Sequence, residues 1–233
     1  MQVTAASEWV RIVEAFGGGL RGTVVVVGAG APDVAEALRR AGGSHLAVET
    51  ERLAVLSNAA LETEPAALSD LPAETADVVL LRRAWADRPA LSMMLRRAHR
   101  AIRSGGRVVA ADVDVDRLMA SSSIRYPSRV QYVLAGGRAD PPRSLHMALS
   151  IETGRAGFKG VHGWEVDEER AVHRDARAYW EAIREEGWPV FRELPADEID
   201  RLLERAAPEL RRVIPIGEVV DRYPWFVVTG TKP

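Results

Sequence analysis

Residues 23–33 read TVVVVGAGAPD. Four valines after a threonine form a short, continuous β-branched run, which is typical of a strand buried on both faces of a parallel sheet. Gly28 and Gly30 then allow a tight turn into a helix that we expect over 33–41. A strand, a glycine turn and a helix in this order predict a site where a ligand approaches the backbone closely. A tight turn that binds nothing is the alternative.

The alternation of strands and helices continues on both sides of this stretch. The apolar patterns predict helices over 8–16, 52–60, 91–103, 143–156, 174–186 and 197–206, and strands over 46–48, 77–81, 107–111, 161–166 and 223–231. Such alternation predicts an α/β fold with a doubly wound, mostly parallel sheet. The chain has no internal repeat, so we expect one domain over residues 1–233, with residues 174–212 as a helical insertion before the last strand.

Composition excludes several classes of function. The net charge is −2 and no basic stripe is present, so we expect no nucleic-acid partner. No apolar run is long enough to span a membrane and the N-terminus does not resemble a signal peptide, so we expect a cytoplasmic protein with no membrane partner. The absence of cysteine excludes disulfides and thiolate ligands, and the five histidines lack metal-ligand spacing, so no metal site is expected. The sequence is compatible with a homo-oligomer.

A carboxylate follows the glycine turn at an informative distance. Glu49 closes the next predicted strand about 20 residues after the turn, where it can accept hydrogen bonds from both hydroxyls of a ribose. Dinucleotides and S-adenosylmethionine are the two ligand classes that use this pair of features. Asp33 stands where the motif G-x-G-x-x-G has its third glycine. This position lies in the first turn of the helix, where an acid would repel a pyrophosphate. S-adenosylmethionine carries no phosphate, so the sequence favours it.

The chain resembles the small-molecule, type 11-like group of class I S-adenosylmethionine-dependent methyltransferases over nearly its whole length. The glycine turn at 28–30 resembles the first motif of that family. The other matching stretches are AVETERL at 47–53 (second strand), DVVL at 77–80 (fourth strand), MLRRAHRAIRSGGRVV at 94–109 (helix, glycine pair and fifth strand), and AGF at 156–158 and WFVVTG at 225–230 (last two strands).

The resemblance implies a Rossmann-like methyltransferase fold with seven strands, the last of them antiparallel. It also implies S-adenosylmethionine as cofactor and methyl transfer to a small-molecule substrate. The residues that it implies for cofactor binding are Gly28, Ala29 and Gly30 at the methionine part, Glu49 with Thr50 at the ribose, and Glu64, or alternatively Glu62, at the adenine. The loop at 113–142 and the insertion at 174–212 would cover the substrate.

The first motif departs from the family pattern at two positions. Val26 stands where the family has an acid, and Pro32 stands where it has a third glycine. Both changes remove polar groups that would bind the methionine end, so the sequence predicts weak cofactor binding. A non-catalytic methyltransferase-fold protein that acts as a binding or structural partner is therefore the alternative function.

No catalytic residue is assigned from the sequence. His146 and His162 are candidate bases, and ordinary partly buried histidines are the alternative for both. Trp85 follows the strand at 77–81. Its ring could stack on the adenine or on the substrate, and the alternative is a position in the core.

Overall fold

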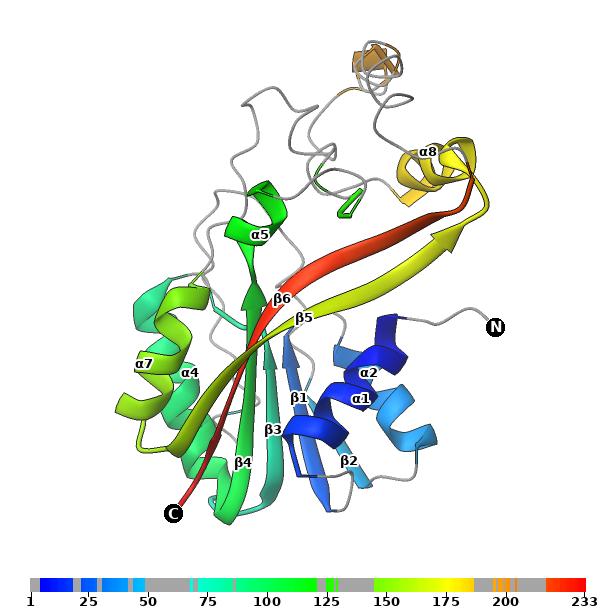
Figure 1. Ribbon diagram of the computed structural model, residues 1–233. Helices are drawn as coiled ribbons and strands as arrows, with labels where there is room; N and C mark the ends of the chain where they lie inside the picture. The colour runs from blue at the N-terminus through cyan, green and yellow to red at the C-terminus, as the bar shows by residue number, and fades with distance from the viewer. Residues whose placement is uncertain are drawn as a thin grey trace.

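The computed structural model describes residues 5–18, 22–28, 31–41, 44–48, 68, 71–85, 87–120, 125–127, 129, 145–186, 195, 197–198, 200–201, 204 and 217–233. Within these residues, six strands form one sheet in the order β2-β1-β3-β4-β6-β5 (Figure 1). The strands are β1 Thr23–Gly28, β2 Ser44–Val48, β3 Ala76–Arg82, β4 Ile102–Val113, β5 Lys159–His173 and β6 Val219–Thr231.

The sheet is mixed, as predicted. Strands β2, β1, β3 and β4 are parallel, while β6 is antiparallel to both β4 and β5. The prediction that 24–27 is an interior strand and that 225–228 is antiparallel near one edge is confirmed. The predicted count of seven strands is not confirmed, since the described residues form six. Residues 49–67, which include the helix expected over 52–60, lie outside the described residues.

Helices cover both faces of the sheet. Helices α1 (Ala5–Phe16) and α2 (Ala31–Arg40) lie on one face, and α4 (Arg88–Ala101) and α7 (His146–Arg155) lie on the other (Figure 1). The four valines of β1 are fully buried and divide between two apolar clusters. Val24 and Val26 pack on the α1/α2 face, whereas Val25 and Val27 pack on the α4/α7 face. Burial of each side chain is worth about 1.5–3 kcal/mol, which explains why this run occupies an interior strand.

Helix α4 begins three residues earlier and ends two residues earlier than predicted. Asp87 caps its N-terminus by accepting a hydrogen bond from the Ala90 amide (2.8 Å), and Pro89 occupies the first turn. The chain becomes extended at Ile102, so the pair Gly105–Gly106 lies inside β4 and does not terminate the helix. Glycine commonly follows a helix, which is why the sequence places the helix end at this pair, but here both glycines belong to a strand.

Strands β5 and β6 form a two-stranded ribbon that is longer than predicted. Strand β4 pairs with β6 only as far as Val113 opposite Trp225, whereas β5 and β6 remain paired to His173 opposite Val219. The ribbon therefore extends past the carboxyl end of β4 toward α8 (Ala176–Glu186), as Figure 1 shows. The short helix α5 (Val115–Ala120) directly follows β4 and was not predicted.

The predicted helical insertion at 174–212 contains the helix α8 over Ala176–Glu186, and most of residues 187–212 fall outside the described residues. The insertion as a whole therefore stays a prediction. Among the described residues, no helix is long and apolar enough to cross a membrane.

Candidate functional site

The carboxyl ends of β1 and β3 meet where the strand order reverses. Strand β1 has β2 on one side and β3 on the other, and ligands of open α/β sheets bind outside the carboxyl ends of the strands at such a point. Gly28 ends β1 opposite Arg82, which ends β3. The φ of Gly28 is +117°, and a Cβ at this position would overlap the Arg82 carbonyl oxygen. The sequence predicts that a ligand approaches the backbone at Gly28. In the structure the group that approaches it is the backbone of β3, and the approach of a ligand stays a prediction.

The other predicted cofactor residues, Ala29, Gly30, Glu49, Thr50 and Glu64, lie outside the described residues, as does Glu62. Their assignment to the cofactor stays a prediction, and only their described neighbours can be placed. Helix α2 begins at Ala31, so Pro32 stands in its first turn, a position that tolerates the missing N–H. Val48 pairs with Val27, so Glu49 directly follows the residue that lies beside the end of β1.

Val26 belongs to the apolar interior. Its side chain is 0% exposed and lies in the cluster that also contains Trp9, Val24 and Leu80. An apolar side chain in this cluster can offer no hydrogen bond to a ligand. The effect of Val26 on cofactor binding stays a prediction.

A buried ion pair stands at the carboxyl end of β3. The Arg82 Nη2 donates to Glu168 Oε1 (2.9 Å), which also accepts from Trp9 Nε1 (2.7 Å). The second oxygen, Glu168 Oε2, accepts from Trp225 Nε1 (2.7 Å). The Arg82 guanidinium lies 4.8 Å from the Trp9 ring centroid and 5.1 Å from that of Trp225. We call these four residues, Arg82, Glu168, Trp9 and Trp225, the Arg82 cluster.

The two charges of the Arg82 cluster differ in exposure. The Glu168 side chain is 1% exposed, while that of Arg82 is 14% exposed. Burial lowers the pKa of Arg82, and the nearby Glu168 carboxylate opposes this effect. Sequence reasoning missed the cluster because Arg82 and Glu168 are 86 residues apart and neither belongs to a recognisable motif.

Asp112 lies near the carboxyl end of β4, one residue beyond Ala111, which is the register partner of Arg82. Its carboxylate is 1% exposed and accepts hydrogen bonds from Trp85 Nε1 (3.2 Å) and the Leu145 amide (2.7 Å). Burial raises the pKa of Asp112, and these hydrogen bonds oppose the rise. Trp85 is 5% exposed and packs in the apolar cluster on the face of the sheet that α4 and α7 cover. Of the two predicted roles, stacking on a ligand or packing in the core, the structure shows the second. Asp112 thus anchors the start of α7 to the sheet.

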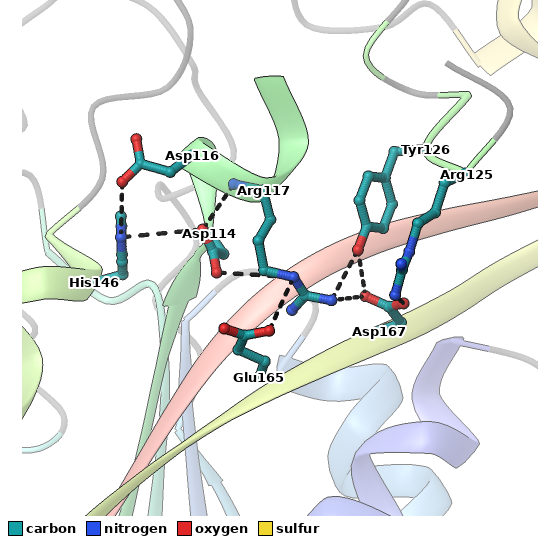
Figure 2. A network of polar contacts seen from close by, with 8 residues as sticks. All are labelled: Asp114, Asp116, Arg117, Arg125, Tyr126, His146, Glu165 and Asp167. Atoms are coloured by element: carbon teal, nitrogen blue, oxygen red, sulfur yellow. Dashed lines mark hydrogen bonds and ion pairs between the residues drawn. The ribbon is translucent and has the colours of Figure 1, made fainter. Parts of the chain in front are cut away.

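A histidine and two acids meet beyond the end of β4 (Figure 2). His146, the first residue of α7, has its Nε2 3.3 Å from Asp116 Oδ2 and 4.0 Å from Asp114 Oδ1. Asp114 also accepts a hydrogen bond from the Arg117 amide (3.0 Å) and so caps α5. The His146 ring lies edge-on to Phe226 of β6, with 6.0 Å between centroids. This places an imidazole and carboxylates at the carboxyl edge, where they can accept and stabilise a proton.

Arg117 connects α5 to the ribbon. Its Nη2 donates to Asp167 Oδ1 (2.7 Å) and to the Tyr126 hydroxyl (2.8 Å), and its Nε lies 3.3 Å from Glu165 Oε2 (Figure 2). Burial, followed by the hydrogen bond to Asp167, raises the pKa of Tyr126. The network drawn in Figure 2 joins four acids, Asp114, Asp116, Glu165 and Asp167, to two arginines, Arg117 and Arg125.

The other histidines of the described chain lie elsewhere. His162 is exposed on the edge strand β5, opposite Thr229, which in turn pairs with Val109 in the middle of β4. His99 lies against Phe158, and burial lowers its pKa. Of the two candidate bases, His146 alone lies at the carboxyl edge. The described residues contain no group of three or more potential ligands that could hold a metal.

No protein-family model and no curated protein sequence matches the chain. The fold is similar to that of a candidate methyltransferase from an antibiotic biosynthesis pathway of Anabaena variabilis, with a TM-score of 0.59, 17% identity and coverage of 96% of both chains. It is also similar to an S-adenosylmethionine-dependent methyltransferase from Archaeoglobus fulgidus (TM-score 0.50, 14% identity, coverage 97% of this chain and 92% of the other). A candidate methyltransferase from Bacillus halodurans gives a TM-score of 0.50 at 13% identity, with coverage of 97% of this chain and 98% of the other. The chain therefore has the class I methyltransferase fold.

Proposed function

We propose that the chain binds S-adenosylmethionine outside the carboxyl ends of β1 and β3 and transfers its methyl group to a small-molecule acceptor over the end of β4. The observation that carries this proposal is the strand order β2-β1-β3-β4-β6-β5 with antiparallel β6, together with the likeness to solved methyltransferase structures. This order puts Gly28 and Arg82 side by side at the point where an α/β sheet binds its ligand.

The chemistry of the residues at this point fits the cofactor. The Arg82 guanidinium suits the methionine carboxylate, and the Glu49 carboxylate suits the two ribose hydroxyls. Gly28, Ala29 and Gly30 would adjoin the methionine part, Thr50 would stand beside the ribose, and Glu64 would contact the adenine. The bound cofactor supplies an activated methyl group on a sulfonium, so alignment of the acceptor provides much of the rate.

On the acceptor side, we assign the role of general base to His146. The neighbouring carboxylates of Asp116 and Asp114 stabilise the imidazolium that forms when an acceptor hydroxyl or ammonium loses its proton. The four carboxylates of the network around Arg117 disfavour a negatively charged acceptor, because like charges repel. Neutral hydroxyl compounds and amines are therefore the acceptor classes to be tested first.

The decisive experiment is a calorimetric titration of the purified protein with S-adenosylmethionine and S-adenosylhomocysteine. It is followed by transfer of labelled methyl to a panel of phenols, alcohols and amines. Because Val26 and Pro32 remove polar groups, we expect a dissociation constant above the low micromolar range, weaker than about −8 kcal/mol. Binding of NAD in place of both ligands would contradict the proposal. Absence of any nucleoside binding would favour the non-catalytic alternative.

A further inference from the structure

The sheet fixes the entry to α7 in place of a side-chain cap. Leu145 precedes the helix, and its apolar side chain cannot accept a hydrogen bond from the first turn. The Leu145 amide instead donates to Asp112 Oδ2 of β4 at 2.7 Å. Because His146 is the next residue and begins α7, this hydrogen bond fixes the backbone directly before the candidate base.

Asp112 also holds the segment that follows β3. Its Oδ2 accepts a second hydrogen bond from Trp85 Nε1 (3.2 Å), and the Arg83 Nε lies 3.9 Å from its Oδ1. Oδ1 accepts a further hydrogen bond from the Val113 amide of its own strand (2.8 Å). Since Asp112 is buried and both oxygens accept hydrogen bonds, the direction of the carboxylate is fixed. Asp112 therefore joins the end of β3, on the proposed cofactor side, to the start of α7, on the proposed acceptor side.

Phe226 contacts the imidazole of His146 from the neighbouring strand. It is the register partner of Asp112 in β6, and directly opposite residues of an antiparallel pair lie on the same face of the sheet. Its ring lies edge-on to that of His146, with 6.0 Å between centroids. The ring also lies against Gly163 of β5, where a Cβ would come within 2.6 Å of Phe226 Cζ. The missing side chain of Gly163 thus leaves the space that the Phe226 ring occupies beside His146.

We propose that the cross-strand pair of Asp112 and Phe226 positions His146 for methyl transfer. Asp112 fixes the backbone before the imidazole, Phe226 fixes one side of its ring, and both residues act through His146 alone. This inference rests on the proposed function, which assigns the general base to His146. A base acts only within hydrogen-bond reach of the proton that it removes, and a displacement of about 1 Å can cost about 100-fold in rate.

The test measures the turnover number for transfer of labelled methyl at saturating cofactor and acceptor, together with the calorimetric affinity for S-adenosylhomocysteine. Asp112→Asn keeps the shape of the side chain but replaces one acceptor oxygen with an NH₂ group, so at least one hydrogen bond is lost. We expect turnover to fall by about 10-fold or more and the affinity to change by less than about 3-fold. Phe226→Leu removes the ring but keeps an apolar side chain, and it should lower turnover by about 5-fold or more.

Double variants distinguish positioning of the base from support of the fold. If Asp112 and Phe226 act only through His146, then Asp112→Asn and Phe226→Leu should cause no further loss of turnover in the His146→Gln background. Losses that multiply with that of His146→Gln would show an effect that does not pass through the imidazole, and they would overturn the inference.

Glu152 supplies the matched control, because it also holds α7. Its carboxylate accepts hydrogen bonds from Ser92 (2.5 Å) and Arg88 (2.7 Å) of α4. Glu152→Gln should destabilise the protein, yet turnover should not change at a temperature where the variant stays folded. If Asp112→Asn fails to fold, Gly163→Ala gives the same readout. Its new methyl group displaces the far end of the Phe226 ring, so turnover should fall in the wild type but not in the His146→Gln background.

The remaining outcomes contradict either this inference or the proposed function. Full turnover of Asp112→Asn and Phe226→Leu, with slow transfer by His146→Gln, would contradict this inference alone. An equal fall in turnover for Glu152→Gln would assign the loss to α7 as a whole and would overturn the inference too. Full turnover of His146→Gln would remove the base on which the inference depends. A wild type that transfers no methyl group would contradict the proposed function itself.

Discussion

Gly28, the last residue of β1, lies opposite Arg82, the last residue of β3, and its missing Cβ leaves space for the Arg82 carbonyl oxygen. At φ +117°, Gly28 has a conformation that other residues rarely adopt. The structure therefore requires this glycine for two reasons of its own, before any ligand binds.

Gly28→Ala should destabilise the protein in the absence of ligand. The unfavourable φ alone costs about 1–3 kcal/mol, and overlap with the Arg82 carbonyl adds to it. Urea unfolding measures the loss. Gly154→Ala is the control, since Gly154 lies in α7 with open space around its Cβ position, and alanine there should be neutral or stabilising by up to about 1 kcal/mol. Unchanged stability of Gly28→Ala would leave close approach of a ligand as the reason for this glycine.

Val26→Asp, which restores the acid of the family motif, should destabilise the fold. The new carboxylate would be placed in the apolar cluster between the sheet and helices α1 and α2, where an uncompensated charge costs about 3 kcal/mol or more. Urea unfolding of this variant, with Val26→Ala as the control for lost volume, separates the charge effect from the cavity effect. If Val26→Asp were as stable as Val26→Ala and bound S-adenosylmethionine more tightly, position 26 would adjoin the cofactor after all.

The fold was largely predictable because its signals are local. The valine run at 24–27 and the apolar period of 91–103 report burial directly, and alternation of such segments leaves few topologies. The length of β5 was not predictable, because beyond Val166 its sequence consists mainly of charged residues with no apolar alternation. Its pairing with β6, which no local pattern encodes, holds this part of the strand in place.

The candidate site was predictable only where one short segment contains it. Gly28 could be recognised from the residues around it, whereas the Arg82 cluster combines four separate elements. Trp9 and Glu168, for example, are 159 residues apart in the chain yet form a 2.7 Å hydrogen bond. Their meeting depends on the path of the ribbon across α1, so only the tertiary structure reveals it.

Glu152 should make stability depend on pH in the acidic range. Hydrogen bonds from Ser92 and then Arg88 lower the pKa of this buried carboxyl from 4.5 to about 2. Because the folded state has the lower pKa, the stabilisation is complete above about pH 4.5 and is lost as the pH falls through about 2. Glu152→Gln should lose on the order of 1–2 kcal/mol at pH 7, a figure reduced for the half-exposed Arg88.

Urea unfolding of wild type and Glu152→Gln between pH 2.5 and 7 tests this pH dependence. The difference between the two proteins should shrink below about pH 4.5. Glu36→Gln, a change in a partly exposed i,i+3 and i,i+4 ion-pair partner on α2, should alter stability by less than about 1 kcal/mol at any pH. A constant difference for Glu152→Gln across the range would show that this carboxyl does not titrate as expected.

Glu49→Ala should weaken binding of S-adenosylhomocysteine without destabilising the free protein. Loss of a charged hydrogen-bond partner to the ribose costs about 1–3 kcal/mol, which is roughly 5- to 150-fold in the dissociation constant. Calorimetric titration with S-adenosylhomocysteine and thermal unfolding without ligand give the two measurements. Unchanged affinity would remove Glu49 from the proposed site and would leave the ribose to other residues.

His146→Gln should lower the turnover number by about 100-fold or more while the affinity for S-adenosylhomocysteine stays unchanged, because a general base acts in the transition state and does not contact the cofactor. The assay is steady-state transfer of labelled methyl to the best acceptor of the panel, at saturating cofactor and acceptor. Asp116→Asn should cause a smaller loss of turnover, since Asp116 is 83% exposed and Asp114 also faces His146.

His162→Gln is the matched control. The His162 imidazole is exposed on β5, level with the middle of β4, so turnover should not change. Equal turnover of His146→Gln and wild type would mean that the contact of His146 with Asp116 only joins α7 to α5. The acceptor would then lose its proton directly to water.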